Sequence, residues 1–126
     1  MQKITKVIGL LFIISLILLM IIPIGNTTSL INNTFTVGLR GDYLLHALIY
    51  LPWMFVGKLL FGVKLNKYIW FAVGLVTVLA LEYIQMLLPY RGFNVNDIIA
   101  GLIGVVLSLI ISSVVSSIIK SKKYKN

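Results

Sequence analysis

Residues 7–24 read VIGLLFIISLILLMIIPI, an apolar run that contains no charged side chain. About 20 such residues, at 1.5 Å each in a helix, are needed to cross the hydrocarbon core of a bilayer. The run is therefore just long enough to span a membrane. Three further apolar runs follow at about 44–63, 68–88 and 98–119. Together the runs predict an all-α polytopic membrane protein built as a bundle of four transmembrane helices.

The composition excludes several other classes of protein. Of the 126 residues, 60% are hydrophobic and only 11% are charged, whereas a soluble domain carries roughly 25% charged residues. A disordered chain would lack this much apolar surface, and the absence of cysteine excludes a disulfide-stapled fold. The net charge of +8 could indicate a nucleic-acid partner. However, the cations flank the apolar runs and form no stripe with interleaved aromatic residues, so we expect no nucleic acid.

The runs are joined into a single domain, residues 1–126. The stretch 25–43 is rich in Asn, Thr, Ser and Gly and is typical of a loop. The connections 64–67 and 89–97 are short, so consecutive helices should be antiparallel neighbours. The first run could also begin a secretory signal. Its apolar core is longer than the usual ~7–15 residues, and no A-x-A-like cleavage site follows, so we interpret it as a retained helix.

The distribution of basic residues predicts the orientation. Positively charged residues near the ends of membrane helices accumulate on the cytoplasmic side. If both termini are cytoplasmic, Arg40 and Arg91 alone face outward, and Lys58 can extend toward the inner surface. The flanking lysines on the inner side are then Lys3, Lys6, Lys64, Lys67, Lys120, Lys122, Lys123 and Lys125.

Polar residues gather at the outer ends of the expected helices. An ionisable residue inside a spanning segment costs at least ~2.5–3.5 kcal/mol, so it marks a functional or a packing site. Residues three or four apart share a helix face, as Asp42 and His46 do, and Glu82 and Gln85. The candidate ligand-binding residues on this side are Asp42, His46, Glu82, Gln85, Arg91 and Asp97.

Within this group, the candidates for catalysis are His46, Asp42 and Glu82, with His46 as general base oriented by Asp42. The structural alternative is that the polar groups only cap helices or hydrogen-bond across them. His46 is the only histidine and no metal-ligand spacing is present, so we expect neither a metal nor a cofactor.

Small residues recur every four positions along the last run. Such a strip lets another helix approach closely, either inside the bundle or in a homo-oligomer. We expect Val105, on a different face, to tolerate replacement by Leu. The strip consists of Ala100, Gly104, Ser108, Ser112 and Ser116.

The ordered motifs between positions 42 and 104 resemble the VanZ-like family of small bacterial membrane proteins. The motifs are Asp42-x-x-x-His46, Glu82-x-x-Gln85, Pro89-x-Arg91, and Asp97 followed by Gly104. Two positions depart from the family pattern: Tyr43 stands where Lys is frequent, and Gly101 stands where Asn is frequent. The resemblance implies the bacterial cytoplasmic membrane, an envelope role and a link to resistance against teicoplanin-type glycopeptides, without an established reaction.

Three functions therefore stay open. The first is an outward pocket that binds or remodels a membrane lipid or a lipid-linked envelope precursor, in which Arg91 pairs with phosphate or carboxylate. The second is an enzyme that acts on a lipid headgroup with His46 as base. The third is a packing or assembly subunit without a ligand of its own.

Overall fold

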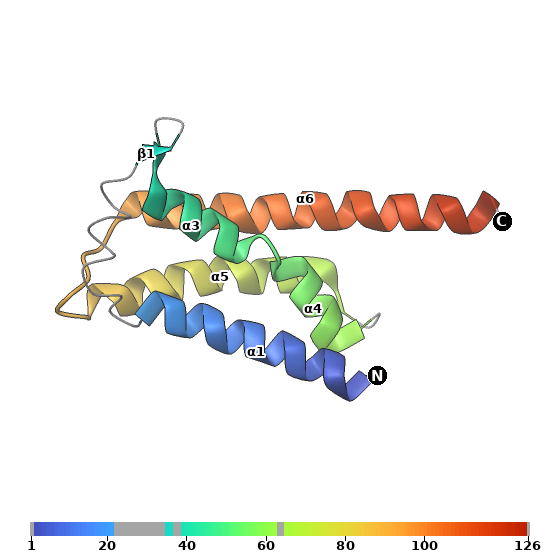
Figure 1. Cartoon of the computed structure of the whole chain (residues 1–126), viewed down its shortest axis with the longest axis horizontal. Helices are drawn as coiled ribbons and strands as arrows, with labels where there is room; N and C mark the ends of the chain where they lie inside the picture. The colour runs from blue at the N-terminus through green and yellow to red at the C-terminus, as the bar shows by residue number, and fades with distance from the viewer. Residues whose placement is uncertain (1, 22–34, 37–38, 63–64, 126) are drawn as a thin grey trace.

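The computed structural model describes residues 2–21, 35–36, 39–62 and 65–125. Five α-helices account for most of them, and two short strands form a small antiparallel ladder (Figure 1). The elements are α1 (Gln2–Ile21), β1 (Phe35–Thr36), β2 (Leu39–Arg40), α3 (Gly41–Tyr50), α4 (Trp53–Phe61), α5 (Lys67–Met86) and α6 (Val95–Lys125).

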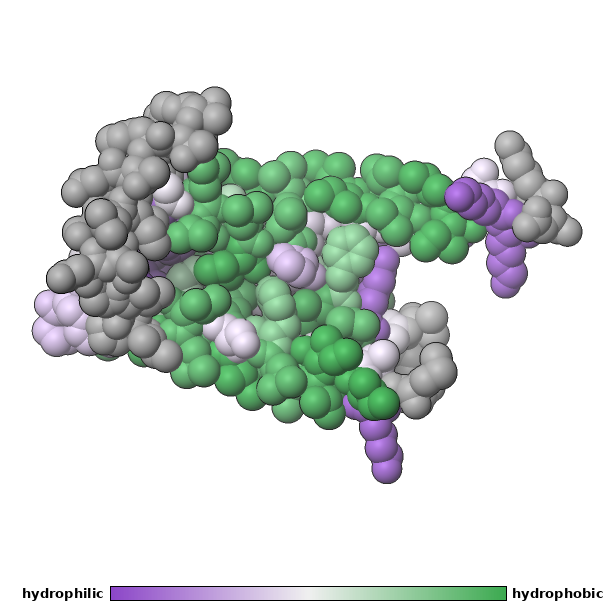
Figure 2. Space-filling model, in the orientation of Figure 1, coloured by the Kyte–Doolittle hydropathy of each residue, from purple (hydrophilic) through white to green (hydrophobic). Residues whose placement is uncertain are grey.

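Four segments of the described chain are long and apolar enough to cross a membrane, which confirms a helical fold with four candidate spans. They are Lys3–Ile21, Gly41–Phe61, Lys67–Met86 and Val95–Lys123. Apolar side chains cover most of the visible surface between the two polar ends (Figure 2). Soluble monomers rarely expose an apolar patch of this extent, so the apolar band indicates a surface that faces lipid.

The second span consists of two helices where the sequence predicted one run over 44–63. Helix α3 ends at Tyr50 and α4 begins at Trp53. Proline has no N–H to donate to the preceding turn, so Pro52 interrupts the helical hydrogen bonds. The Pro52 carbonyl then accepts from the backbone N–H of Val56 at 3.0 Å, which starts α4.

Other boundaries also differ from the expected ones. Helix α1 begins at Gln2, before the expected start at 7, and ends at Ile21. Helix α6 extends beyond 98–119 at both ends. Both helices include flanking lysines, because Lys is a good helix former. Most of the expected loop 25–43 lies outside the described residues. Its described part contains β1 and β2, whose Phe35 pairs with Arg40 and Thr36 with Leu39, followed by the first residues of α3.

The helices form a bundle whose two ends differ. Helix α3 packs chiefly against α6, and α1 packs against α4 (Figure 1). The two chain termini lie at one end, where α6 projects beyond its neighbours. The β1–β2 hairpin, the start of α3 and the connection from α5 to α6 lie at the opposite end, which we call the hairpin end.

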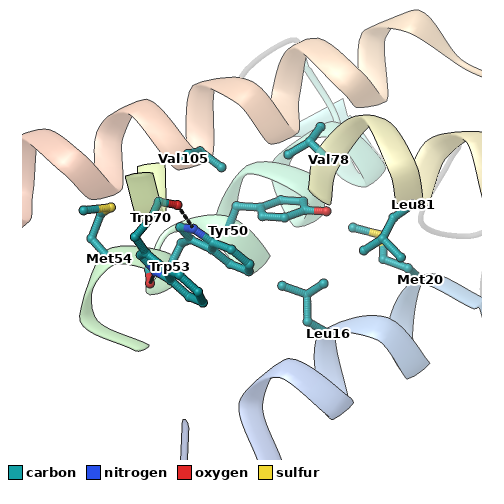
Figure 3. Packing of buried hydrophobic residues seen from close by; sticks show 9 residues of the cluster. All are labelled: Leu16, Met20, Tyr50, Trp53, Met54, Trp70, Val78, Leu81 and Val105. Carbon is teal, nitrogen blue, oxygen red and sulfur yellow. Dashed lines mark hydrogen bonds between the residues drawn. The ribbon is translucent and has the colours of Figure 1, made fainter. Parts of the chain in front are cut away.

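Two tryptophans from different helices bond to each other in the core. The Trp53 indole N–H donates to the Trp70 carbonyl at 3.0 Å, and the Trp70 N–H donates to the Trp53 carbonyl at 2.8 Å (Figure 3). Their rings stack with centroids 4.8 Å apart. A Cβ at Gly57 would meet the Trp70 indole, and one at Gly74 would come within 2.6 Å of the Trp53 indole. The two glycines therefore provide the space in which the rings stack.

The small-residue strip of α6 faces α3 and α4 of the same chain. A Cβ on Gly104 would collide with the backbone carbonyl of Ala47. The Ser108 hydroxyl accepts the backbone N–H of Met54 at 2.9 Å, which satisfies a donor at the start of α4. The expectation for Val105 was wrong, because Val105 is fully buried and packs in the core cluster with Trp53 and Tyr50. The cluster reaches into the side of α6 next to the strip, so this face has no room for a longer side chain.

Candidate functional site

Three ionisable side chains converge at the hairpin end from three helices. His46 comes from α3, Glu82 from the last turns of α5 and Asp97 from the first turn of α6. One ligand atom from each lies within 4.8 Å of those of the other two. All three side chains are buried, with relative exposures of 8%, 4% and 9%. We call this group the His46 cluster.

The orientation of His46 is set by the main chain. Its Nδ1 lies 2.8 Å from the backbone carbonyl of Asp42, one turn earlier in α3. A carbonyl only accepts, so Nδ1 carries the proton and donates it. The same nitrogen is 4.0 Å from a carboxylate oxygen of Asp97. The other nitrogen, Nε2, is buried and has no hydrogen-bond partner among the described residues.

Asp42 therefore acts on His46 in a different way from the expected one. The contact runs through its carbonyl, which any residue at this position would offer, and its carboxylate accepts the N–H of Tyr43 at 3.0 Å. The Tyr43 hydroxyl accepts a hydrogen bond from the side-chain amide of Asn96 at 3.2 Å. This bond joins the first turns of α3 and α6.

Glu82 holds the connection between α5 and α6. Its carboxylate accepts the backbone N–H of Asn94 at 2.8 Å. Asn94 in turn caps α6: its side chain accepts from the N–H of Asn96 at 3.1 Å and its carbonyl from that of Asp97 at 3.0 Å. An Asn just before a helical run is a capping signal, so this role of Asn94 is visible in the sequence.

Gln85 has a structural partner. Its amide nitrogen donates to the backbone carbonyl of Met20 at 2.8 Å and lies 3.2 Å from the Met20 sulfur. Nearby, the Tyr90 hydroxyl donates to the Ile21 carbonyl at 2.8 Å. The last carbonyls of a helix have no intrahelical partner. Gln85 and Tyr90 thus satisfy two such groups at the end of α1.

Arg91 lies in the connection that Glu82 holds and does not enter the His46 cluster. Its side chain is half-buried and forms no ion pair within the part of the chain that the structure describes. Arg91 lies three positions before Asn94, so the two Cα atoms are at most about 11 Å apart. The guanidinium is therefore a candidate partner for a negatively charged group near the cluster.

Tyr50 is a residue that the sequence reasoning missed. It lies one turn after His46 on α3, and residues four apart share a face. The residue is 1% exposed, and its hydroxyl has no hydrogen-bond partner among the described residues. Figure 3 shows the hydroxyl pointing toward Leu81 of α5. Its helical spacing from His46 is the signal that could have found it.

The donor set of the His46 cluster also fits a metal ion. One imidazole nitrogen and two carboxylate oxygens are ligands that zinc and manganese accept. Nε2 of His46 has no partner among the described residues, and a carbonyl that holds Nδ1–H is a usual outer contact of a metal-bound histidine. The Glu82 carboxylate, however, already accepts the N–H of Asn94. The expectation of no metal stays a prediction, and the geometry supplies a reason to test it.

No known family model, curated protein or solved structure matches the chain.

Proposed function

We propose that this protein is a multi-pass protein of the bacterial cytoplasmic membrane that binds or remodels the polar headgroup of an envelope lipid or lipid-linked component. The binding site is the His46 cluster together with Arg91. One observation carries the proposal: His46 Nε2 and the Tyr50 hydroxyl are buried a turn apart without a hydrogen-bond partner in the described residues. Buried polar atoms are nearly always satisfied, so a bound polar group is their expected partner.

The orientation proposed here places the site at the outer leaflet. Both termini lie at the end opposite the His46 cluster (Figure 1). Most lysines are close in sequence to the two termini or to the connection between α4 and α5. Positive residues mark the cytoplasmic side. The hairpin end, with the His46 cluster, therefore faces outward.

The residues at the site favour a headgroup that carries both hydroxyl or amine groups and a phosphate. Glu82, Asp97 and His46 Nε2 accept hydrogen bonds, so they suit donors such as hydroxyls and amines. Arg91 has the planar donors that bind a phosphate or a carboxylate in two places. A headgroup that contacts both Arg91 and the His46 cluster would place its phosphate at the connection between α5 and α6. Its hydroxyls or amine would then lie in the His46 cluster.

The same geometry favours a second candidate, an enzyme that acts on a lipid headgroup. A neutral imidazole whose Nδ1–H is held by a carbonyl presents the lone pair of Nε2, which is what a general base needs. His46 would then take a proton from a headgroup hydroxyl while Arg91 stabilises developing negative charge. Because Nδ1 is held by a main-chain carbonyl, Asp42→Asn should leave this orientation unchanged.

The replacement His46→Gln separates these candidates from a purely structural role. Wild type and variant are purified under the same conditions, and co-purified lipid is identified by native mass spectrometry. We expect a lipid to accompany the wild type and to be reduced at least about tenfold in the variant at equal membrane abundance. Asp42→Asn is the matched control, because it alters the carboxylate and keeps the carbonyl that holds His46.

The phenotype to score comes from the VanZ-like resemblance. A deletion strain carrying each variant is exposed to lipid-tailed glycopeptides and to vancomycin. An enzyme loses all effect with His46→Gln, whereas a binder is only weakened. Arg91→Lys should restore part of the effect lost in Arg91→Ala, since Lys keeps the charge and loses the planar fork. Loss of phenotype in proportion to loss of membrane abundance would show that the polar groups are structural.

A further inference from the structure

A cavity lies between α4, α5 and α6, at the end of the bundle opposite the His46 cluster. It has a volume of about 590 Å³. Figure 2 shows hydrophilic side chains in the hollow between the projecting α6 and the rest of the molecule. The cavity is lined by Met54, Lys58, Gly62, Leu65, Lys67, Ser112, Ser113, Ser116, Ser117 and Lys120.

The charges lining the cavity are all positive. Lys58, Lys67 and Lys120 line it from three different helices, and the Lys67 ammonium lies 4.9 Å from the centre of the exposed Tyr68 ring at the start of α5. The chain has only three acidic residues, which lie in the first turn of α3, the last turns of α5 and the first turn of α6, at the hairpin end. No carboxylate therefore lines this cavity to balance the lysines.

Lys58 is the least expected of these cations, because it belongs to the membrane span Gly41–Phe61. Its ammonium donates to the Ser116 hydroxyl at 2.9 Å and lies 5.6 Å from the centre of the Phe55 ring. Both partners are uncharged. Lys58 lies near the end of its span and can extend to the membrane surface, so its ammonium is placed where an anionic headgroup would lie.

Two of the four lining serines have their hydroxyl protons engaged within α6. The Ser116 hydroxyl donates to the Ser112 carbonyl at 2.7 Å, and the Ser117 hydroxyl donates to the Ser113 carbonyl at 3.0 Å. The other donors that line the cavity are the hydroxyls of Ser112 and Ser113 and the ammonium groups of the lysines, each of which carries three N–H bonds.

The geometry points to a binding site for a phosphate group, with an anionic phospholipid of the cytoplasmic leaflet as its direct source. A cavity of this volume lies within the range of small-molecule sites. Basic pockets between membrane helices on the cytoplasmic side bind anionic headgroups. Met54 and Leu65 offer apolar contacts beside the lysines. This site is separate from the His46 cluster and does not depend on the function proposed for it.

The test compares two triple variants that lose the same charge. The cavity variant is Lys58→Met, Lys67→Gln and Lys120→Gln, in which Met keeps the membrane span apolar. The control variant is Lys3→Gln, Lys122→Gln and Lys123→Gln, whose lysines are exposed outside the cavity. Each protein is titrated in detergent with phosphatidylglycerol, with phosphatidylcholine and with inorganic phosphate, and binding is followed by native mass spectrometry and thermal stability.

We expect phosphatidylglycerol to bind the wild type and the control variant, and phosphatidylcholine to bind much more weakly. Each removed lysine should weaken binding about fivefold, so the cavity variant should lose on the order of a hundredfold. Stabilisation by inorganic phosphate alone, lost in the cavity variant, would identify soluble phosphate as the source. Equal binding to both variants, or no binding of either anion by a correctly folded wild type, would overturn the proposal. The single variant Lys58→Arg keeps the charge and should bind as the wild type does, which controls for a folding defect.

Discussion

His46 and Glu82 show how a buried polar residue can serve structure and function at once. Glu82 uses its carboxylate to hold the backbone of Asn94, whereas His46 leaves Nε2 without a partner in the described chain. A residue whose donors and acceptors are all used contributes to the fold. A residue with an unused buried atom is the better candidate for binding a ligand.

The bond from Asn94 to Glu82 predicts a difference between two substitutions. Glu82→Gln keeps an oxygen that can accept the Asn94 N–H, so the free energy of unfolding should change by less than about 1 kcal/mol. Glu82→Ala removes the acceptor and should lower it by roughly 1–3 kcal/mol. Unfolding in mixed micelles by a denaturing detergent measures both. An equal loss in the two variants would mean that the negative charge, rather than the hydrogen bond, stabilises the connection.

The metal content of the purified protein tests whether the His46 cluster binds a metal ion. Because His46 is the only histidine and the sequence has no metal-ligand spacing, we expect no zinc or manganese at one ion per chain. Elemental analysis by mass spectrometry, before and after treatment with a chelator, measures this. A one-to-one metal that is lost in Glu82→Ala and in His46→Gln would contradict the expectation and would indicate a metal centre.

At the level of helices, α4 and α5 pack against each other at two glycines, where the absence of a side chain lets an indole ring approach closely. Trp53 and Gly57 on α4, like Trp70 and Gly74 on α5, are four residues apart, so each helix presents a ring and a gap on one face. Each indole occupies the gap of the other helix and donates to the carbonyl of the opposite tryptophan. The pair therefore ties α4 to α5 within the apolar core.

Adding a single methyl group at either gap should weaken this contact. Gly57→Ala and Gly74→Ala should each lower the free energy of unfolding by about 1–3 kcal/mol, because the indole must move from a stacked and hydrogen-bonded position. The tryptophan fluorescence spectrum should change as well. Gly92→Ala is the control, since nothing lies within 4 Å of the added atom. If Gly92→Ala lost stability while Gly57→Ala and Gly74→Ala did not, the explanation would be refuted.

The strip on α6 makes a corresponding prediction for its contact with α3. Gly104→Leu should lower the folded yield in detergent strongly, because the new side chain meets the carbonyl of Ala47 in the α3 backbone. Overpacking of this kind costs at least 1–3 kcal/mol. Val106→Leu, at 42% exposure, should keep the wild-type yield. A tolerated Gly104→Leu would show that α3 and α6 do not pack as described.

On the scale of the whole molecule, the two ends carry opposite chemistry. The acidic residues and the only histidine belong to the hairpin end, and Lys58, Lys67 and Lys120 line the cavity at the end where both termini lie. A bilayer maintains such an asymmetry, because the distribution of basic residues decides which end remains in the cytoplasm.

Reporter fusions test the resulting orientation. A reporter that is active only in the cytoplasm should work when fused after Asn126. A reporter that is active only outside should work when inserted near Asn32, a position outside the described residues. Replacing Lys120, Lys122 and Lys123, three of the four lysines at the end of α6, should weaken the preference for this orientation. The reverse pattern of activity in the wild type would place the His46 cluster in the cytoplasm and remove the basis for an envelope ligand.

The sequence alone was sufficient for the number of candidate spans and for their approximate ends. Length and hydropathy are local properties, so the runs near 7–24, 68–88 and 98–119 predicted α1, α5 and α6 to within a few residues at most ends. The break at Pro52, which the prediction of one run over 44–63 did not include, has an equally local cause in the missing N–H of proline. The gathering of His46, Glu82 and Asp97 at one end followed from their positions near helix ends.

Only the tertiary structure decided which atoms of those residues face each other. The rotation of each helix about its axis and the angle between helices determine these contacts, and neither can be derived from spacing within one helix. Hence His46 contacts the carbonyl of Asp42 rather than its carboxylate, Gln85 caps α1, and Val105 lies in the core. The lysine-lined cavity likewise exists only because α4, α5 and α6 meet there, since its cations come from three separate segments of the chain.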